Sequence, residues 1–254
     1  MPEIDSKERF GNRVDNYVKY RPSYPSEAID YIVAQTKSND QSVIADLGSG
    51  TGKFTRLLLE RCFCVVAVEP NDNMREAAEK ELSDFDGFRS IPASAEKTTL
   101  DNNSIDLITV AQAFHWFDRD ICKAEFKRIL KPNGCVCLIW NRRETTPGFI
   151  KDYSDIIKKW YDHYSAGSAQ EHITAAVFDE FFDGNYQIKN FHWNEPHDFE
   201  GLLGRSLSNS HAPVVGHLNH EPLKADLRDL FERYNENGTV YFEYRTEVVI
   251  GRLK

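Results

Sequence analysis

The chain has 254 residues, of which 41% are hydrophobic and 12% aromatic, so it can bury a sizeable core in one large or two small domains. Its formal net charge of −9, from 31 basic and 40 acidic residues, argues against a general nucleic-acid-binding protein, which neutralises phosphates with Lys and Arg. No apolar stretch approaches the roughly 20 residues that cross a bilayer, and the N-terminus MPEIDSKERF has no apolar signal core. We therefore expect a cytoplasmic protein with no membrane or nucleic-acid partner.

Apolar periodicity predicts alternating helices and strands over the first 141 residues. The expected helices are residues 5–20, 26–37, 52–61, 71–81 and 119–130, and the expected strands are residues 42–47, 64–68, 88–91, 106–113 and 135–140. The segment LKPNG, at residues 130–134, is typical of a helix stop and a turn. This alternation predicts a parallel sheet with helices on both faces, which binds ligands beyond the carboxyl ends of its strands.

The pattern changes after residue 141. Residues 149–163, 199–213 and 223–238 look helical, residues 187–193 look like a strand, and residues 239–253 form one long strand or a hairpin. The five cysteines include two Cys-x-Cys pairs beside strand-like runs, Cys62/Cys64 and Cys135/Cys137. A zinc site would need Cys-x-x-Cys pairs, so we expect no metal and interpret the cysteines as small buried core residues.

A glycine-rich loop between two apolar runs is the most informative motif. Residues 43–52 read VIADLGSGTG, and the next apolar run, VVAVE, ends at Glu69. A strand, a glycine turn, a helix and a second strand that ends in an acid form a nucleotide-binding half of a doubly wound sheet. Glycines allow a ligand to approach the backbone, and the acid can accept hydrogen bonds from both ribose hydroxyls. The sequence therefore predicts a cofactor that contains adenosine.

The spacing of this loop separates three classes of cofactor. A phosphate-binding P-loop fails because Phe54 follows Gly52 and Lys53, where the motif needs Ser or Thr. A dinucleotide fingerprint needs its third glycine one residue later, and Asp46 would repel a pyrophosphate. S-adenosylmethionine carries a sulfonium and an amino-acid end but no phosphate, so it suits the loop better.

Four motifs in series resemble the class I S-adenosylmethionine-dependent methyltransferases. They are ADLGSGTGKFT, VVAVEPNDNM, IPASAEKTTLDNNSIDLITVAQAFHWFD and LKPNGCVCLIWN, in the family's order over residues 43–141. The segment YRPSYP, at residues 20–25, resembles the small-molecule branch near the trans-aconitate methyltransferases. The resemblance implies a Rossmann-like α/β fold with a seven-stranded, mostly parallel sheet, helices on both faces, an antiparallel last strand and a helical lid. It implies one domain over 1–254, with a core of about 41–141, 185–194 and 239–253 and a lid from 1–40 and about 145–235.

The resemblance also assigns the cofactor, S-adenosyl-L-methionine, to residues at the carboxyl ends of the predicted strands. The first loop would hold its amino-acid end and sugar, Glu69 its ribose hydroxyls, and Met74 and Ser94–Glu96 the adenine. Met74 at one helical turn equally fits core packing. The expected cofactor-binding residues are Asp46, Gly48, Ser49, Gly50, Gly52, Glu69, Pro70, Met74, Ser94, Ala95, Glu96, Ala111 and Gln112.

Catalytic and substrate-binding candidates follow the fourth strand or lie in the expected lid. His115 has a near-neutral pKa as a residue type and could serve as a general base, as could Tyr20. Arginines in the lid could pair with a carboxylate. The substrate or lid candidates are Tyr17, Arg21, Tyr24, Trp116 and Arg205, and each also fits ordinary packing or a polar surface.

These observations favour an enzyme that transfers a methyl group from S-adenosylmethionine to a small-molecule acceptor, with a carboxylic acid as one candidate. A cofactor-binding protein without methyltransferase activity is an alternative, as is a methyltransferase that acts on a protein or RNA. A nicotinamide-dependent dehydrogenase is less favoured by the glycine spacing and Asp46. The sequence leaves open the acceptor atom, the need for a base, and whether the protein is a monomer or a homodimer.

Overall fold

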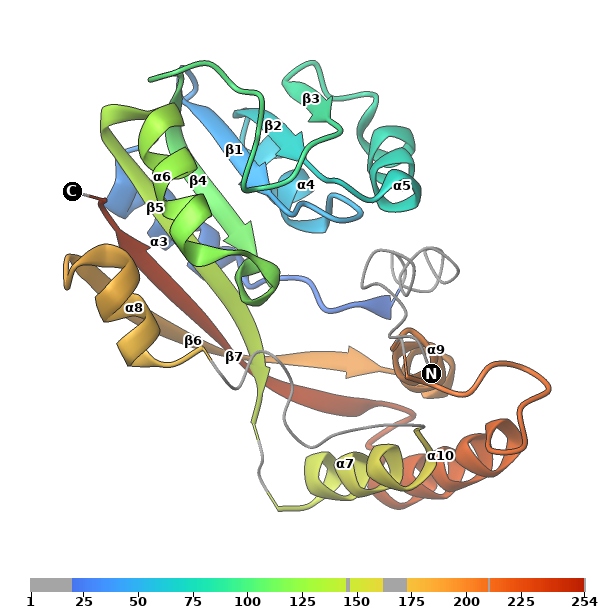
Figure 1. The fold of residues 1–254 in the computed structure, drawn as a ribbon. Coiled ribbons are helices and arrows are strands. Elements are labelled where there is room, and N and C mark those ends of the chain that lie inside the picture. Colours follow the sequence, from blue (N-terminus) through green and yellow to red (C-terminus); the bar gives the residue numbers. More distant parts are fainter. Residues whose placement is uncertain (1–19, 145–146, 162–172, 210, 254) are drawn as a thin grey trace. The chain divides into compact units, whose positions relative to one another are not determined.

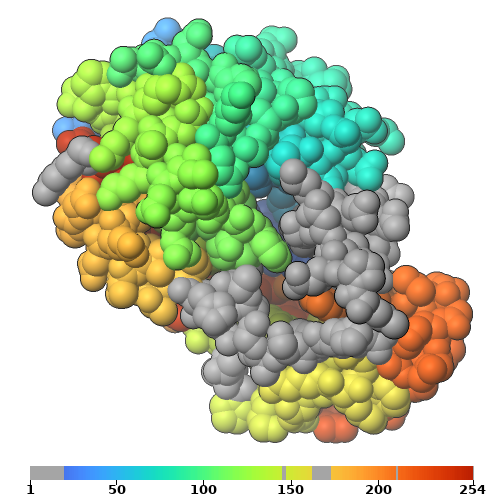
Figure 2. All heavy atoms as spheres, in the orientation of Figure 1, coloured from blue at the N-terminus to red at the C-terminus, as the bar shows by residue number. Residues whose placement is uncertain are grey.

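A computed structural model describes residues 20–144, 147–161, 173–209 and 211–253, which Figure 1 draws in colour as a ribbon and Figure 2 as spheres. These residues fall into two compact units. The described part of unit 1 comprises residues 20–22, 142–144, 147–161, 192–209 and 211–245, and that of unit 2 comprises residues 23–141, 173–191 and 246–253. The helix expected over residues 5–20 lies almost wholly outside the described residues.

Seven strands form one sheet in the order β3-β2-β1-β4-β5-β7-β6. The strands are β1 (Val43–Leu47), β2 (Cys64–Val68), β3 (Phe88–Ile91), β4 (Ile105–Ala111), β5 (Leu130–Arg143), β6 (Tyr186–His197) and β7 (Val240–Gly251). The first five pair in parallel and the last strands are antiparallel, so the predicted fold class is confirmed. Because β1, β2 and β4 are parallel neighbours, their carboxyl ends lie at one edge of the sheet (Figure 1).

Unit 2 buries both faces of its part of the sheet. Consecutive residues of β1 divide between two apolar clusters: Ile44 packs with α3 (Ser26–Thr36) and α4 (Lys53–Leu59), and Ala45 packs with α6 (Arg119–Ile129) and α8 (Ala175–Phe182). This is the two-residue period of a strand that is covered on both sides. A further helix, α5 (Asp72–Leu82), is capped by Asn71, whose side chain accepts the Met74 N–H at 3.1 Å.

The helix stop predicted at LKPNG is found, but the prediction of a turn there is wrong. The helix α6 ends at Ile129, and the chain enters β5 directly at Leu130. Leu130 pairs with Ile105, but the next pair is Leu107 with Cys135, so residues 131–134 form an irregularity within the strand. The Lys131 ammonium lies 2.7 Å from the Asp106 carboxylate, which lies opposite this irregularity.

The cysteine prediction is partly wrong. Cys122, Cys135 and Cys137 are buried, whereas Cys62 and Cys64 are exposed. Cys62 takes a positive φ of 62° in the turn after α4, and Cys64 is the first residue of β2.

Among the described residues, no group of three or more His, Cys, Asp or Glu could hold a metal ion. The described helices are also too short or too polar to span a membrane.

Unit 1 contains α7 (Phe149–Trp160), α9 (Phe199–Leu207) and α10 (His220–Tyr234), together with parts of β5, β6 and β7. Leu223, Leu227 and Leu230 follow the helical period and are at most 1% exposed. They join an apolar cluster that includes Phe242 and Tyr244 of β7. Residues 240–251 form a single long strand, which resolves the alternative left by the sequence.

Candidate cofactor-binding site

The loop after β1 depends on glycines for both conformation and space. Gly48, Gly50 and Gly52 have φ values of 67°, 57° and 76°, a region that residues with a Cβ rarely adopt. A Cβ on Gly48 would lie 2.6 Å from the Ala113 Cβ, and one on Gly52 would lie 2.6 Å from the Leu82 Cδ1. A Cβ on Gly50 would meet only the Met74 sulfur, at 3.8 Å. The outer glycines thus fit the loop against its neighbours, while Gly50 keeps a more open backbone surface.

Glu69 joins this loop to the end of β2. One carboxylate oxygen accepts the Gly50 N–H at 2.9 Å and the other accepts the Asn71 N–H at 2.8 Å. The residue is 7% exposed. The Glu69 carboxylate therefore lies against the glycine loop, at the position where the ribose hydroxyls are expected from the sequence.

Asp46, in β1, is buried and hydrogen-bonded to two threonines. It is 0% exposed, and its two carboxylate oxygens accept hydrogen bonds from the hydroxyls of Thr55, at 2.6 Å, and Thr109, at 2.9 Å. Burial raises the pKa of this carboxyl to about 6, with a smaller contribution from the Glu69 charge, although the two threonine hydrogen bonds act in the opposite direction. Asp46 therefore links β1 to α4 and β4, and its contact with a cofactor stays a prediction.

Ser49 supplies the clearest sign that a polar ligand belongs at the loop. Its hydroxyl oxygen is buried and has no hydrogen-bond partner among the described residues. A buried hydroxyl without a partner costs roughly 1–3 kcal/mol, which a ligand could offset by bonding to it. Together with the open side of Gly50 and the Glu69 carboxylate, it gives a set of groups that fits a neutral sugar and an amino-acid end.

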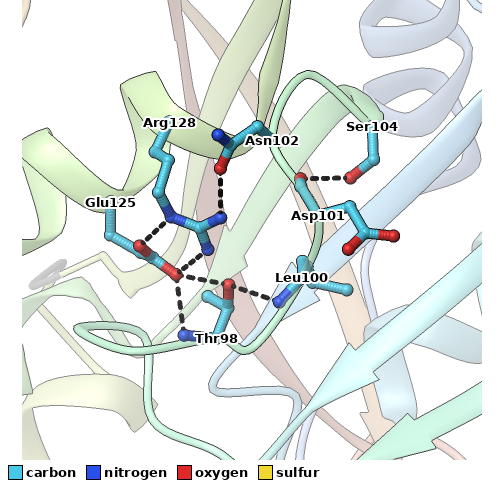
Figure 3. A network of polar contacts seen from close by, with 7 residues as sticks. All are labelled: Thr98, Leu100, Asp101, Asn102, Ser104, Glu125 and Arg128. Atoms are coloured by element: carbon cyan, nitrogen blue, oxygen red, sulfur yellow. Dashed lines mark hydrogen bonds and ion pairs between the residues drawn. The ribbon is translucent and has the colours of Figure 1, made fainter.

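The segment that follows Ser94, Ala95 and Glu96 is held by a polar network (Figure 3). Glu125 of α6 accepts the Thr98 N–H at 2.9 Å and the Thr98 hydroxyl at 2.6 Å. Arg128 donates to both oxygens of Glu125 at 2.7 Å, and its Nη1 donates to Asn102 at 2.7 Å. The Arg128 hydrogen bonds lower the pKa of Glu125 to about 2, and the Thr98 hydrogen bonds act in the same direction. Ala95 is 3% exposed, and Glu96 accepts the Asp118 N–H at 3.1 Å.

The carboxyl end of β4 carries Ala111, Gln112 and His115. Gln112 has a φ of 60°, unusual for a residue with a side chain, and its N–H donates to the Ile139 carbonyl at 2.9 Å. His115 lies in a short 3-10 helix, Phe114–Trp116, with its ring 4.7 Å from that of Trp116. Trp116 is 51% exposed.

The remaining candidates divide between the units. Tyr24, in unit 2, packs edge-on against Phe54 at 5.0 Å. In unit 1, Tyr20 lies against Gly204, where a Cβ would clash with its ring, and Arg205 donates to the Tyr244 hydroxyl. Arg21 also belongs to unit 1, and Tyr17 lies outside the described residues. Sequence reasoning missed the Glu125–Arg128 network and Arg143, which the proposals below use.

Comparison with known proteins finds similarity to methyltransferases over part of the chain. Residues 45–138 match the methyltransferase domain family. A type II methyltransferase proposed in Anaeromyxobacter dehalogenans has the same fold, with a TM-score of 0.66 at 20% identity over 92% of this chain and 98% of that chain. An uncharacterized methyltransferase of Mycobacterium tuberculosis is 38% identical over 148 residues, which cover 58% of each chain. The malonyl-[acyl-carrier protein] O-methyltransferase of a Marinomonas species is 27% identical over 63% of this chain and 61% of its own.

Residues 45–138 are therefore similar to a methyltransferase domain, and the fold is that of a solved structure described as a methyltransferase. The matched residues, 45–138, contain the glycine loop and Glu69. The sequence matches span about 58% of the length of the Mycobacterium tuberculosis relative.

Proposed function

We propose that the protein transfers a methyl group from S-adenosylmethionine to a small-molecule acceptor and that a carboxylic acid is the first acceptor to test. The observation that carries the proposal is the glycine loop with its buried Ser49 hydroxyl, beside a Glu69 carboxylate that already binds Gly50. Ser49, the Gly50 backbone and Glu69 would hold the cofactor, with Met74 beside its adenine. When bound, the cofactor supplies an activated methyl group on a sulfonium.

The contribution of the chain is to bind, orient and exclude water, because the methyl group is already activated. A carboxylate acceptor is its own nucleophile and needs no general base. A hydroxyl or amine acceptor would need one, and His115 is then the candidate in unit 2, at the carboxyl end of β4. Similarity to a protein named malonyl-[acyl-carrier protein] O-methyltransferase supports carboxyl oxygen as the first acceptor atom to test.

The test is transfer of a tritiated methyl group from S-adenosylmethionine to a panel of small carboxylic acids, alcohols and amines. Methyl esters release volatile methanol in base, which separates carboxyl products from ethers and methylamines. We expect label in esters, and we expect Glu69→Gln to lower the rate at limiting cofactor. Tight cofactor binding without transfer to any class of acceptor, proteins and RNA included, would instead identify a non-catalytic binding protein.

A further inference from the structure

Two partly exposed arginines of unit 1, Arg143 and Arg205, differ from six arginines that lie in ion pairs. Arg56, Arg61, Arg75, Arg128, Arg233 and Arg245 each lie within 4.0 Å of an acidic side chain. Among the described residues, no ion pair includes Arg143 or Arg205. Both are only partly exposed, so each carries a guanidinium charge that is shielded from water and has no adjacent counter-charge.

These two arginines lie among tyrosines, in a set that we call the arginine–tyrosine cluster: Arg143, Arg205, Tyr153, Tyr161 and Tyr244. The Arg143 guanidinium carbon lies 5.3 Å from the centre of the Tyr153 ring. Burial raises the pKa of Tyr161 well above its usual value, and the charges of Arg143, Arg205 and Arg21 act in the opposite direction. Three positive charges therefore act on one buried hydroxyl, which makes the cluster electropositive.

The acidic residue that acts on this cluster does not neutralise it. Glu195 contributes to raising the pKa of Arg205, as the Tyr244 and Tyr153 hydroxyls also do, against a larger opposing effect of burial. Its carboxylate lies 3.1 Å from the His197 ring, and it forms no ion pair with Arg205. The upward direction of the Arg205 pKa keeps this side chain charged at any physiological pH.

The hydrogen bonds of Arg205 leave donors for a ligand. Its Nε and Nη2 donate to the Tyr244 oxygen at 3.1 and 2.7 Å. Since a guanidinium has five N–H groups, three remain without a hydrogen-bond partner among the described residues. The Tyr244 oxygen accepts from Arg205, so its own O–H proton is directed elsewhere. The Tyr244 ring is fixed by stacking on Trp193 at 5.1 Å.

We propose that Arg205, Arg143 and the Tyr244 hydroxyl form an anion site in unit 1 that binds a carboxylate of a small organic acid. The planar guanidinium fork matches the two oxygens of a carboxylate, and an anion offsets the cost of burying the two positive charges. That this acid is the methyl acceptor, or carries the accepting group, rests on the proposed function. The anion site itself does not.

The test is calorimetric titration of the full chain at constant ionic strength with acetate, succinate, citrate, inorganic phosphate and the neutral ester dimethyl succinate. We expect saturable binding of succinate or citrate and no binding of the ester. Arg205→Gln and Arg143→Gln should each raise that Kd at least about tenfold, because each removes charge-assisted hydrogen bonds to the anion. The matched control is Arg233→Gln, which removes a paired, 62% exposed arginine of the same unit and should leave Kd unchanged.

Two further measurements keep the test decisive. Tyr244→Phe retains the stacked ring and removes only the hydroxyl, so it should also weaken binding if Arg205→Gln fails to fold. S-adenosylhomocysteine is titrated separately into each variant and should bind with an unchanged Kd. Anion binding without S-adenosylhomocysteine binding would refute the proposed function alone. The anion site is refuted if no carboxylate binds, if the ester binds equally, if phosphate binds more tightly, or if the arginine variants bind like wild type.

Discussion

Glu125→Gln should destabilise unit 2 in a pH-dependent way, because Glu125 fastens the segment after Ser94–Glu96 to α6. Both oxygens of Glu125 accept hydrogen bonds, from Thr98 and Arg128. A glutamine can keep one oxygen, but its amide N–H would then face the Arg128 donor. The substitution therefore removes a charge pair and also places two donors against each other.

The size of the effect follows from the pKa. Lowering it from 4.5 to about 2 corresponds to about 3 kcal/mol in favour of the folded state above pH 4.5. Arg128 is 37% exposed, so water screens part of this interaction. We expect a loss of about 2 kcal/mol at pH 7, or a fall in Tm of about 4–8 °C for a chain of this length.

The assay is thermal or urea unfolding of wild type and Glu125→Gln between pH 7 and pH 3. Because the folded pKa is depressed, the stabilisation is present above pH 4.5 and is lost as the pH falls toward 2. The two stability curves should therefore converge at acid pH. Glu79→Gln is the control, since its carboxylate is 46% exposed and lies 3.5 Å from Arg75. A difference that is constant with pH, or no larger than in the control, would refute the reasoning.

Three other outcomes follow from the cofactor loop. Glu69→Gln should raise the Kd of S-adenosylhomocysteine about tenfold or more in calorimetry, because an NH2 group replaces one of the two acceptor oxygens. An unchanged Kd would show that Glu69 does not bind the cofactor. Gly52→Ala should lower Tm more than Gly238→Ala. Both glycines have a positive φ, but only at Gly52 would the added Cβ lie 2.6 Å from Leu82. Equal losses of Tm would show that backbone strain, and not the contact with Leu82, causes the effect. The contribution of Asp46 to stability should fall as pH rises from 3.8 through about 6, because its raised pKa makes the folded state bind the extra proton. In unfolding titrations, wild type should therefore lose more stability over this range than Asp46→Asn, and equal slopes would contradict the assignment.

The sequence predicted the strands best where local pattern and burial agree. Residues 64–68 form β2 with the expected bounds, because a short apolar run bounded by turns is buried on both faces. Residues 88–91 form β3 with the expected bounds, although only Ile91 of that strand is buried. The predicted turn at LKPNG is absent. Pairing with β4 and the Lys131–Asp106 contact hold these residues in the strand, although the segment contains a proline and a glycine.

The candidate site was predictable only in its local parts. The glycine loop and Glu69 follow from spacing, and the structure places the Gly50 N–H against the Glu69 carboxylate. The network of Glu125 with Thr98 and the cluster of Arg143 with Arg205 join residues that are distant in the chain, and no local pattern marks their partners. Likewise, Asp46 accepts hydrogen bonds from threonines of α4 and β4. The sequence spacing predicts that Asp46 lies near the end of the first strand, but it does not predict these two partners.

The most direct test of the account is thermal unfolding of the full chain with S-adenosylhomocysteine and, separately, with NAD. A ligand at 100 times its Kd stabilises the folded protein by about 2.7 kcal/mol, which for this length raises Tm on the order of 5–11 °C. We predict such a rise with S-adenosylhomocysteine and none with NAD. In Glu69→Gln at the same ligand concentration, a tenfold higher Kd would reduce the rise to about half. A rise with NAD alone would contradict the assignment of the glycine loop to S-adenosylmethionine.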